Sequence, residues 1–187
     1  MSNRLKGFAV LAMFFPAGMV IGGYIYLGQF NRLLADDYCS VYYADRLGLF
    51  RSVWYWYITW HGGYSASTMD WLLSVVGYKL LPWTVMLFLV AWVLFAAGIV
   101  KNAVFPGKLS PFVLGVSLLL GMLPVFAVLI INPENSQSLI WWGGARGYLS
   151  PLVVITFYFL MYFVFINSDW PLWQAGIWYF ASFLIVF

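Results

Sequence analysis

Long apolar runs separated by short polar segments are the dominant pattern of this chain. Runs of span length cover 8–30, 83–100, 110–131, 148–166 and 171–187. An α-helix of about 20 apolar residues crosses the hydrocarbon core of a bilayer, and the strict alternation that marks a barrel strand is lacking. Because a chain in lipid must satisfy its own backbone hydrogen bonds, the pattern predicts an all-α, polytopic transmembrane bundle of about five spans.

A shorter period marks the segment between the first and second runs. Polar or small residues recur every three or four positions over 45–62, and an apolar stripe lies opposite them, consisting of Leu47, Phe50, Trp54 and Ile58. This pattern predicts an amphipathic helix along the membrane surface. Ser67 and Asp70 then fit a capping box before an apolar run, so a second juxtamembrane helix is predicted to begin there.

Composition agrees with a membrane protein and excludes several other classes. The chain has 187 residues, of which 64% are hydrophobic and 8% charged, whereas soluble domains carry about 25% charged residues. The nine Lys and Arg side chains are scattered along the chain and form no nucleic-acid surface. Cys39 is the only cysteine, which excludes an internal disulfide. Neither a phosphate loop nor a dinucleotide fingerprint is present, and we expect one membrane domain over 1–187.

The positions of the cations predict the orientation of the chain in the cell membrane. Cytoplasmic loops are enriched in Lys and Arg. Arg4 and Lys6 precede the first span, which is too long for a cleaved signal peptide, and Lys101 and Lys108 lie between the second and third spans. We therefore expect a cytoplasmic N-terminus, with 31–82 and 132–147 outside, although four cations in 31–82 oppose this rule: Arg32, Arg46, Arg51 and Lys79.

The end of the chain leaves two alternatives. The last apolar run reaches Phe187 without a flanking cation or turn. A natural multi-span protein can end in this way, and so can the N-terminal part of a longer chain.

Two adjacent carboxylates, Asp36 and Asp37, stand where the first span leaves the lipid. Neighbouring residues point in different directions in a helix or a strand, so the two side chains are not expected to act as a symmetric pair. One interpretation makes one of them a base and the other a cation ligand or helix cap. The alternative is that both are solvated at the end of a span, where charge is tolerated.

Three short stretches together resemble a known family. They are "ADDYC" at 35–39, "YITWHGGYSAS" at 57–67 and "NPENSQSLIWWGGARGYLSP" at 132–151. With the expected topology, they resemble the N-terminal part of GT-C superfamily membrane glycosyltransferases, in which an acidic outer loop and juxtamembrane helices follow the first span. The resemblance implies sugar transfer from a polyprenyl-phosphate donor, with membrane lipids and that donor as partners.

The resemblance also implies roles for individual residues. Asp36 or Asp37 would act as the catalytic base. The developing phosphate charge would be stabilised by Arg146, Arg46 or His61. Contacts with the sugar or the lipid would come from Trp60, Trp141 and Trp142. No residue is assigned to a metal, and the resemblance leaves a requirement for a divalent cation open.

Each of these roles has a simpler structural alternative. Arg146 can be an interfacial anchor, His61 a hydrogen-bonded structural group, and the tryptophans part of the interfacial aromatic belt. A non-catalytic accessory subunit of a larger membrane complex is the competing function. It is favoured because related sequences often carry an Arg after Trp-x-Gly, where this chain has Gly63. A small transporter ranks last, since no ionisable residue lies deep in a span.

Overall fold

The chain folds as helices throughout its described part, so the all-α prediction is confirmed. The computed structural model describes residues 3–59, 64–168, 171, 173–174, 176–178 and 180, without the side chains of 3–11, 13 and 64. The elements, in chain order, are α1 (Asn3–Gly28), α2 (Asp36–Thr59), α3 (Tyr64–Val76), the 3₁₀ turn η1 (Tyr78–Leu80), α4 (Leu81–Val104), α5 (Pro111–Ile131), the π-helical turn η2 (Ser136–Ile140), α6 (Trp142–Gly144), the π-helical turn η3 (Ala145–Leu149) and α7 (Ser150–Ile166).

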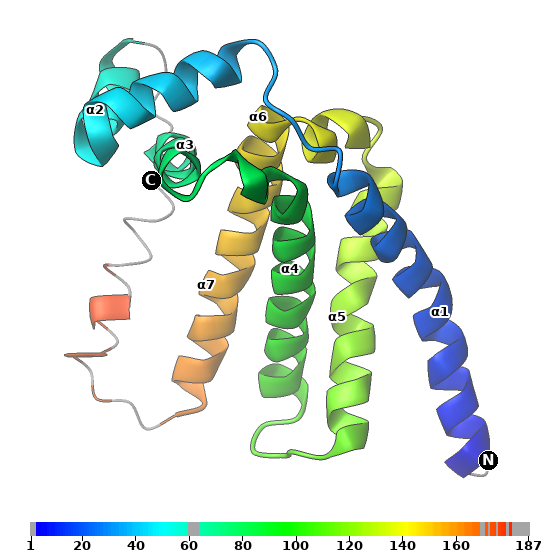
Figure 1. Cartoon of the computed structure of the whole chain (residues 1–187). Coiled ribbons are helices and arrows are strands. Elements are labelled where there is room, and N and C mark those ends of the chain that lie inside the picture. Colours follow the sequence, from blue (N-terminus) through cyan, green and yellow to red (C-terminus); the bar gives the residue numbers. More distant parts are fainter. Residues whose placement is uncertain are drawn as a thin grey trace.

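Four long helices form the bundle. α4 packs against both α5 and α7, and α1 packs on α5 and α4 (Figure 1). Among the described residues, three segments are long and apolar enough to cross a membrane: Tyr78–Val104, Pro111–Ile131 and Trp142–Ile166. α5 has 21 residues and is therefore about 31 Å long at 1.5 Å per residue, which matches the hydrocarbon core. Within α1, residues Phe14–Gly28 form a shorter apolar helix.

The bundle core lies between α1, α4, α5 and the start of α7. Its fully buried centre consists of Val85, Leu89 and Val125. The helices come close where one residue is small: a Cβ atom added to Gly121 would lie 2.5 Å from the backbone nitrogen of Ala97. Small residues allow this close approach in membrane bundles, where van der Waals packing holds helices together.

α2 and α3 pack on each other and lie across one end of the bundle (Figure 1). A second hydrophobic cluster joins them to α4 and α6, and it consists of Leu33, Val41, Leu73, Leu81 and Trp142. α2 is kinked at Gly48, whose φ of 73° and ψ of 174° are not helical. Since L-residues rarely adopt a positive φ, glycine suits this position.

Several predicted boundaries are corrected by the structure. The first juxtamembrane helix begins at Asp36 rather than at 45, because carboxylates in the first turn of a helix favour helix formation there. The capping box at Ser67 and Asp70 is wrong, since α3 already includes Tyr64 and both residues lie inside it. The second and fourth apolar segments begin earlier than predicted, at Tyr78 and Trp142. Most of the predicted span 171–187 lies outside the described residues.

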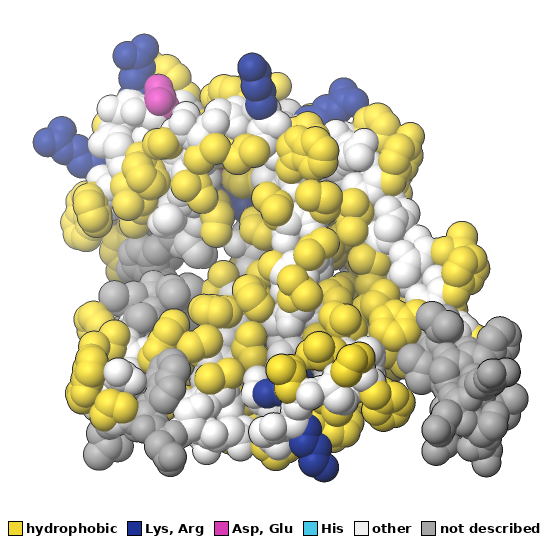
Figure 2. All heavy atoms as spheres, turned by 60° about the horizontal axis from the view of Figure 1, so that its bottom comes forward, with side chains coloured by type: hydrophobic (Ala, Val, Ile, Leu, Met, Phe, Trp, Pro, Cys, Tyr) yellow, Lys and Arg dark blue, Asp and Glu magenta, His cyan; other side chains and the backbone are white. Residues whose placement is uncertain are grey.

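Three of the four residues in the predicted apolar stripe of α2 are exposed, and the fourth, Leu47, is half-buried. Phe50 is 85% exposed, and Trp54 and Ile58 are also exposed, whereas Ser52 and Trp56 are buried. α2 therefore packs through the stripe that contains its small residues. In Figure 2, Lys and Arg side chains gather mainly at two opposite edges of the molecule, with apolar side chains spread between them, as expected for a protein with a lipid-facing belt.

Candidate functional site

The two adjacent aspartates occupy different environments at the start of α2. Asp36 is exposed, whereas the side chain of Asp37 is 1% exposed. The turn before α2 produces this difference, because Ala35 has a φ of 42° and the backbone N–H of Leu34 donates to Oδ2 of Asp37 at 3.1 Å. Asp37 thus closes the turn that starts α2, and Asp36 projects from the same turn.

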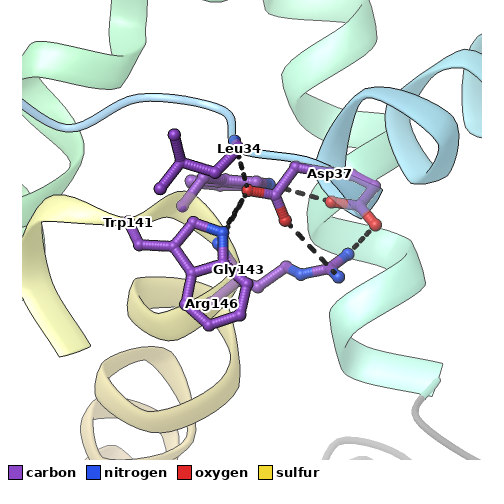
Figure 3. Close-up of polar contacts among 7 residues, drawn as sticks. Leu34, Asp37, Trp141, Gly143 and Arg146 are labelled. Atoms are coloured by element: carbon purple, nitrogen blue, oxygen red, sulfur yellow. Dashed lines mark hydrogen bonds and ion pairs between the residues drawn. The ribbon is translucent and has the colours of Figure 1, made fainter. Parts of the chain in front are cut away.

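Two further donors, from the segment between α5 and α7, bind the same oxygen of Asp37 (Figure 3). The indole Nε1–H of Trp141 donates to Oδ2 at 2.6 Å, and the backbone N–H of Gly143 donates to it at 3.3 Å. Arg146 Nη2 lies 3.9 Å from the other oxygen, Oδ1. Oδ2 is therefore fully engaged, while in the described part of the chain the polar contact of Oδ1 is this longer one with the guanidinium.

A second buried carboxylate, Asp70 of α3, completes the cluster. Arg146 Nη1 donates to Oδ2 of Asp70, and the indole Nε1–H of Trp142 donates to Oδ1 at 2.9 Å. Asp70 is 1% exposed and Arg146 14% exposed. Arg146 thus connects two buried carboxylates from different helices, the arrangement for which a planar guanidinium is suited. We call Asp37, Asp70, Arg146, Trp141 and Trp142 the carboxylate–arginine cluster.

Sequence reasoning missed the role of Asp70, and a signal for it was present. Ser67, Asp70 and Leu73 are spaced by three residues and are all buried, so they lie on one face of α3. An acidic residue on the same stripe as a core leucine indicates a buried carboxylate that needs a partner.

Backbone pairing joins the segment between α1 and α2 to the segment between α5 and α7 beside the cluster. Arg32 N–H donates to the carbonyl of Ile140, and Trp142 N–H donates to the carbonyl of Arg32, both at 3.0 Å. Two glycines allow close contacts here, Gly143 between the two segments and Gly144 within the second one. A Cβ atom at Gly143 would lie 2.8 Å from Oδ1 of Asp37, and one at Gly144 would collide with the carbonyl oxygen of Gln137. The "WWGG" sequence therefore allows the second segment to lie against the aspartate.

A groove lies next to the cluster and shares Trp141 with it. It has a volume of about 520 Å³ and a mostly apolar lining. Its lining residues are Arg32, Leu34, Ser136, Gln137, Ile140 and Trp141. Trp141 is thus shared: its ring lines the groove and its indole N–H binds Asp37.

The other predicted site residues lie apart from the cluster or outside the described residues. Arg46 is exposed, and its guanidinium carbon lies 5.5 Å from the centroid of the Tyr42 ring. Trp60 and His61 are outside the described residues. Trp142 is 3% exposed and packs in the second hydrophobic cluster, which leaves its ring no open face for a sugar. Among the side chains that the structure describes, no group of three or more His, Cys, Asp or Glu residues lies together.

Fold and site define a helical membrane protein with a buried carboxylate–arginine cluster at one end of its bundle. No family model, no curated protein and no solved structure matches the chain.

Proposed function

We propose that this chain is the donor-binding membrane part of a GT-C-type glycosyltransferase, which transfers a sugar from a polyprenyl phosphate at the outer membrane face. In this proposal the bundle has five spans and a cytoplasmic N-terminus. α2 and α3 lie in the outer interface, and the exposed apolar stripe of α2 contacts lipid. The observation that carries the proposal is the buried Asp37 carboxylate, which is oriented by Trp141, Gly143 and Arg146 beside an open groove.

Asp37 is the base in this reaction. Among the described residues, Arg146 alone is within ion-pair distance of its Oδ1, at 3.9 Å, so we assign this oxygen, which the acceptor would reach only after the cluster opens, to accept the proton of the acceptor hydroxyl. The hydroxyl oxygen attacks the anomeric carbon from one side as the bond between that carbon and the phosphate oxygen breaks. The electron pair leaves with the polyprenyl phosphate, and the configuration at the carbon is inverted. Positioned general bases contribute about 10²–10⁴-fold to rate.

Arg146 is a positioning residue for Asp37 in this scheme. Its guanidinium already connects two carboxylates, so the donor phosphate is not assigned to it. Trp141 holds Oδ2 and thereby fixes the direction in which Oδ1 points. Because α1 leads to Asp37 and α7 follows Arg146, the base is fixed relative to two long helices.

The test compares Asp37→Asn with Asp36→Asn in the full chain in native membranes, supplied with a panel of radiolabelled polyprenyl-phosphate hexoses. We expect Asp37→Asn to reduce transfer about 10²–10⁴-fold, while the exposed Asp36→Asn retains it. Stable insertion of both variants is checked by membrane flotation. Two results would refute the proposal. In the first, Asp37→Asn transfers sugar at the parent rate. In the second, the parent protein releases polyprenyl phosphate from none of the donors in the panel.

The closed shape of the cluster favours one alternative, a non-catalytic accessory subunit. A guanidinium held by two buried carboxylates also serves to join helices, and such a subunit would need no accessible base. In that case the Asp37→Asn variant would lose the bound membrane partner in affinity purification, and the parent would show no transfer.

A further inference from the structure

The groove beside Trp141 lies at the level where the helices leave the bundle. α1 ends at Gly28, only a few residues before Arg32, and α5 ends at Ile131, shortly before Ser136. Both ends lie at the end of the bundle that α2 and α3 cover (Figure 1). For helices of membrane-spanning length, this is the level of the lipid headgroups.

The groove combines one cation with apolar walls. Arg32 is exposed, and its side chain makes a single hydrogen bond, from Nε–H to the carbonyl of Phe30 at 3.3 Å. No carboxylate in the described part of the chain pairs with it. Leu34, Ile140 and the Trp141 ring provide the apolar part of the lining. An unpaired guanidinium beside apolar walls matches an amphiphile that has a phosphate headgroup and a hydrocarbon tail.

We propose that this groove binds a phosphate-bearing membrane lipid, with Arg32 contacting the phosphate and the apolar wall contacting the first part of its tail. This inference deepens the proposed function, because it assigns the phosphate of the donor lipid to Arg32 rather than to Arg146, Arg46 or His61. Arg32 is better suited than Arg146 because its remaining guanidinium nitrogens are free of protein partners, whereas those of Arg146 bind Asp37 and Asp70.

Replacing the Arg32 side chain is expected to leave the local fold intact. The contacts that join the two outer segments use the backbone N–H and carbonyl of this residue, not its side chain. Arg32→Gln therefore removes the charge and retains the pairing. Arg32→Lys keeps the charge but loses the planar fork. Arg51→Gln is the matched control, because Arg51 is an exposed cation on α2 that does not line the groove.

Binding is measured on the delipidated full chain in a neutral detergent by native mass spectrometry. The three probes are a polyprenyl monophosphate, the matching polyprenol and inorganic phosphate. We expect the monophosphate to bind the parent, Arg51→Gln and, within a few fold, Arg32→Lys. Arg32→Gln should bind it roughly 10- to 100-fold more weakly, as for the loss of a hydrogen bond between charged groups. The polyprenol should bind the parent as weakly as the monophosphate binds Arg32→Gln.

Three results would overturn the inference. They are unchanged binding of the monophosphate to Arg32→Gln, equal binding of the polyprenol by the parent, and displacement of the lipid by inorganic phosphate at equal concentration. The last result would identify a free-phosphate site instead. Failure of the proposed function is distinguishable, because an Asp37→Asn variant tests transfer and should still bind the monophosphate through Arg32.

Discussion

Removing the guanidinium of Arg146 should destabilise the protein more than any other single change of charge in its described part. Arg146→Met keeps most of the side-chain length but leaves Asp37 and Asp70, each 1% exposed, without their shared cation. Breaking a buried ion pair by removing one partner costs about 3–5 kcal/mol, because the remaining charge stays buried and uncompensated. Arg146 is 14% exposed, so solvent screens the pair little, and two carboxylates lose their partner at once. We expect a loss of at least about 3 kcal/mol in the free energy of unfolding.

The assay is unfolding of the purified chain by titration with sodium dodecyl sulfate in mixed micelles, followed by circular dichroism. Arg51→Met is the control, since Arg51 is exposed on α2 and surface substitutions change stability by about 0.5 kcal/mol or less. Combining Arg146→Met with Asp37→Asn and Asp70→Asn should recover part of the loss, because neutral side chains are less costly to bury than unpaired charges. A loss below about 1 kcal/mol for Arg146→Met would refute the argument, since it would mean that the carboxylates do not depend on this cation.

Two further predictions concern the segment between α5 and α7 and the orientation of the chain. Gly143→Ala should lower the free energy of unfolding by about 1–3 kcal/mol, because the added Cβ would lie 2.8 Å from Oδ1 of Asp37. A Cβ at Gly147 would meet no atom within 4 Å, so Gly147→Ala should be neutral in the same titration. Equal effects of the two substitutions would contradict the contact. Cys39 is exposed near the start of α2, so under the proposed topology a membrane-impermeant maleimide should label it in intact cells. Lys108→Cys in a Cys39→Ser background should be labelled only after permeabilisation. The reverse result would invert the proposed topology.

The sequence was sufficient to predict the helical class. It was also sufficient to predict the three described segments that are long and apolar enough to cross a membrane. Apolar length is a direct consequence of bilayer thickness, so segments such as Pro111–Ile131 could be located within a few residues. Boundaries were less accurate where polar residues belong to a helix. Short helical turns extend two of the apolar segments at their N-terminal ends: a 3₁₀ turn at Tyr78–Leu80, and a short α-helix followed by a π-helical turn over 142–149. No hydropathy pattern distinguishes such turns from loops.

The candidate site could be predicted only in part, because it depends on contacts between distant segments. The sequence indicated Asp37, Arg146 and the tryptophan pair as candidates, but not that they meet, since Asp37 and Trp141 are 104 positions apart. Asp70 was assigned to a helix cap because Ser-x-x-Asp before an apolar run is a local pattern. Its actual partners, Trp142 and Arg146, are 72 and 76 positions away. The capping pattern alone does not distinguish these two roles, and the spacing of Asp70 from Leu73 indicates burial but not which distant guanidinium binds the carboxylate.

The three charged members of the cluster are connected to three different long helices. Asp37 follows the end of α1, Asp70 lies on α3, which leads through η1 into α4, and Arg146 lies in the turn that leads into α7. A shift of any one of these helices along its axis would therefore change the contacts of Arg146 with at least one carboxylate. The cluster thus both stabilises the relative positions of three helices and makes the orientation of Asp37 depend on them. A base held in this way is sensitive to the packing of the whole bundle, so substitutions far from Asp37, such as Gly121→Val at the contact of α4 and α5, should alter the proposed transfer as well as stability.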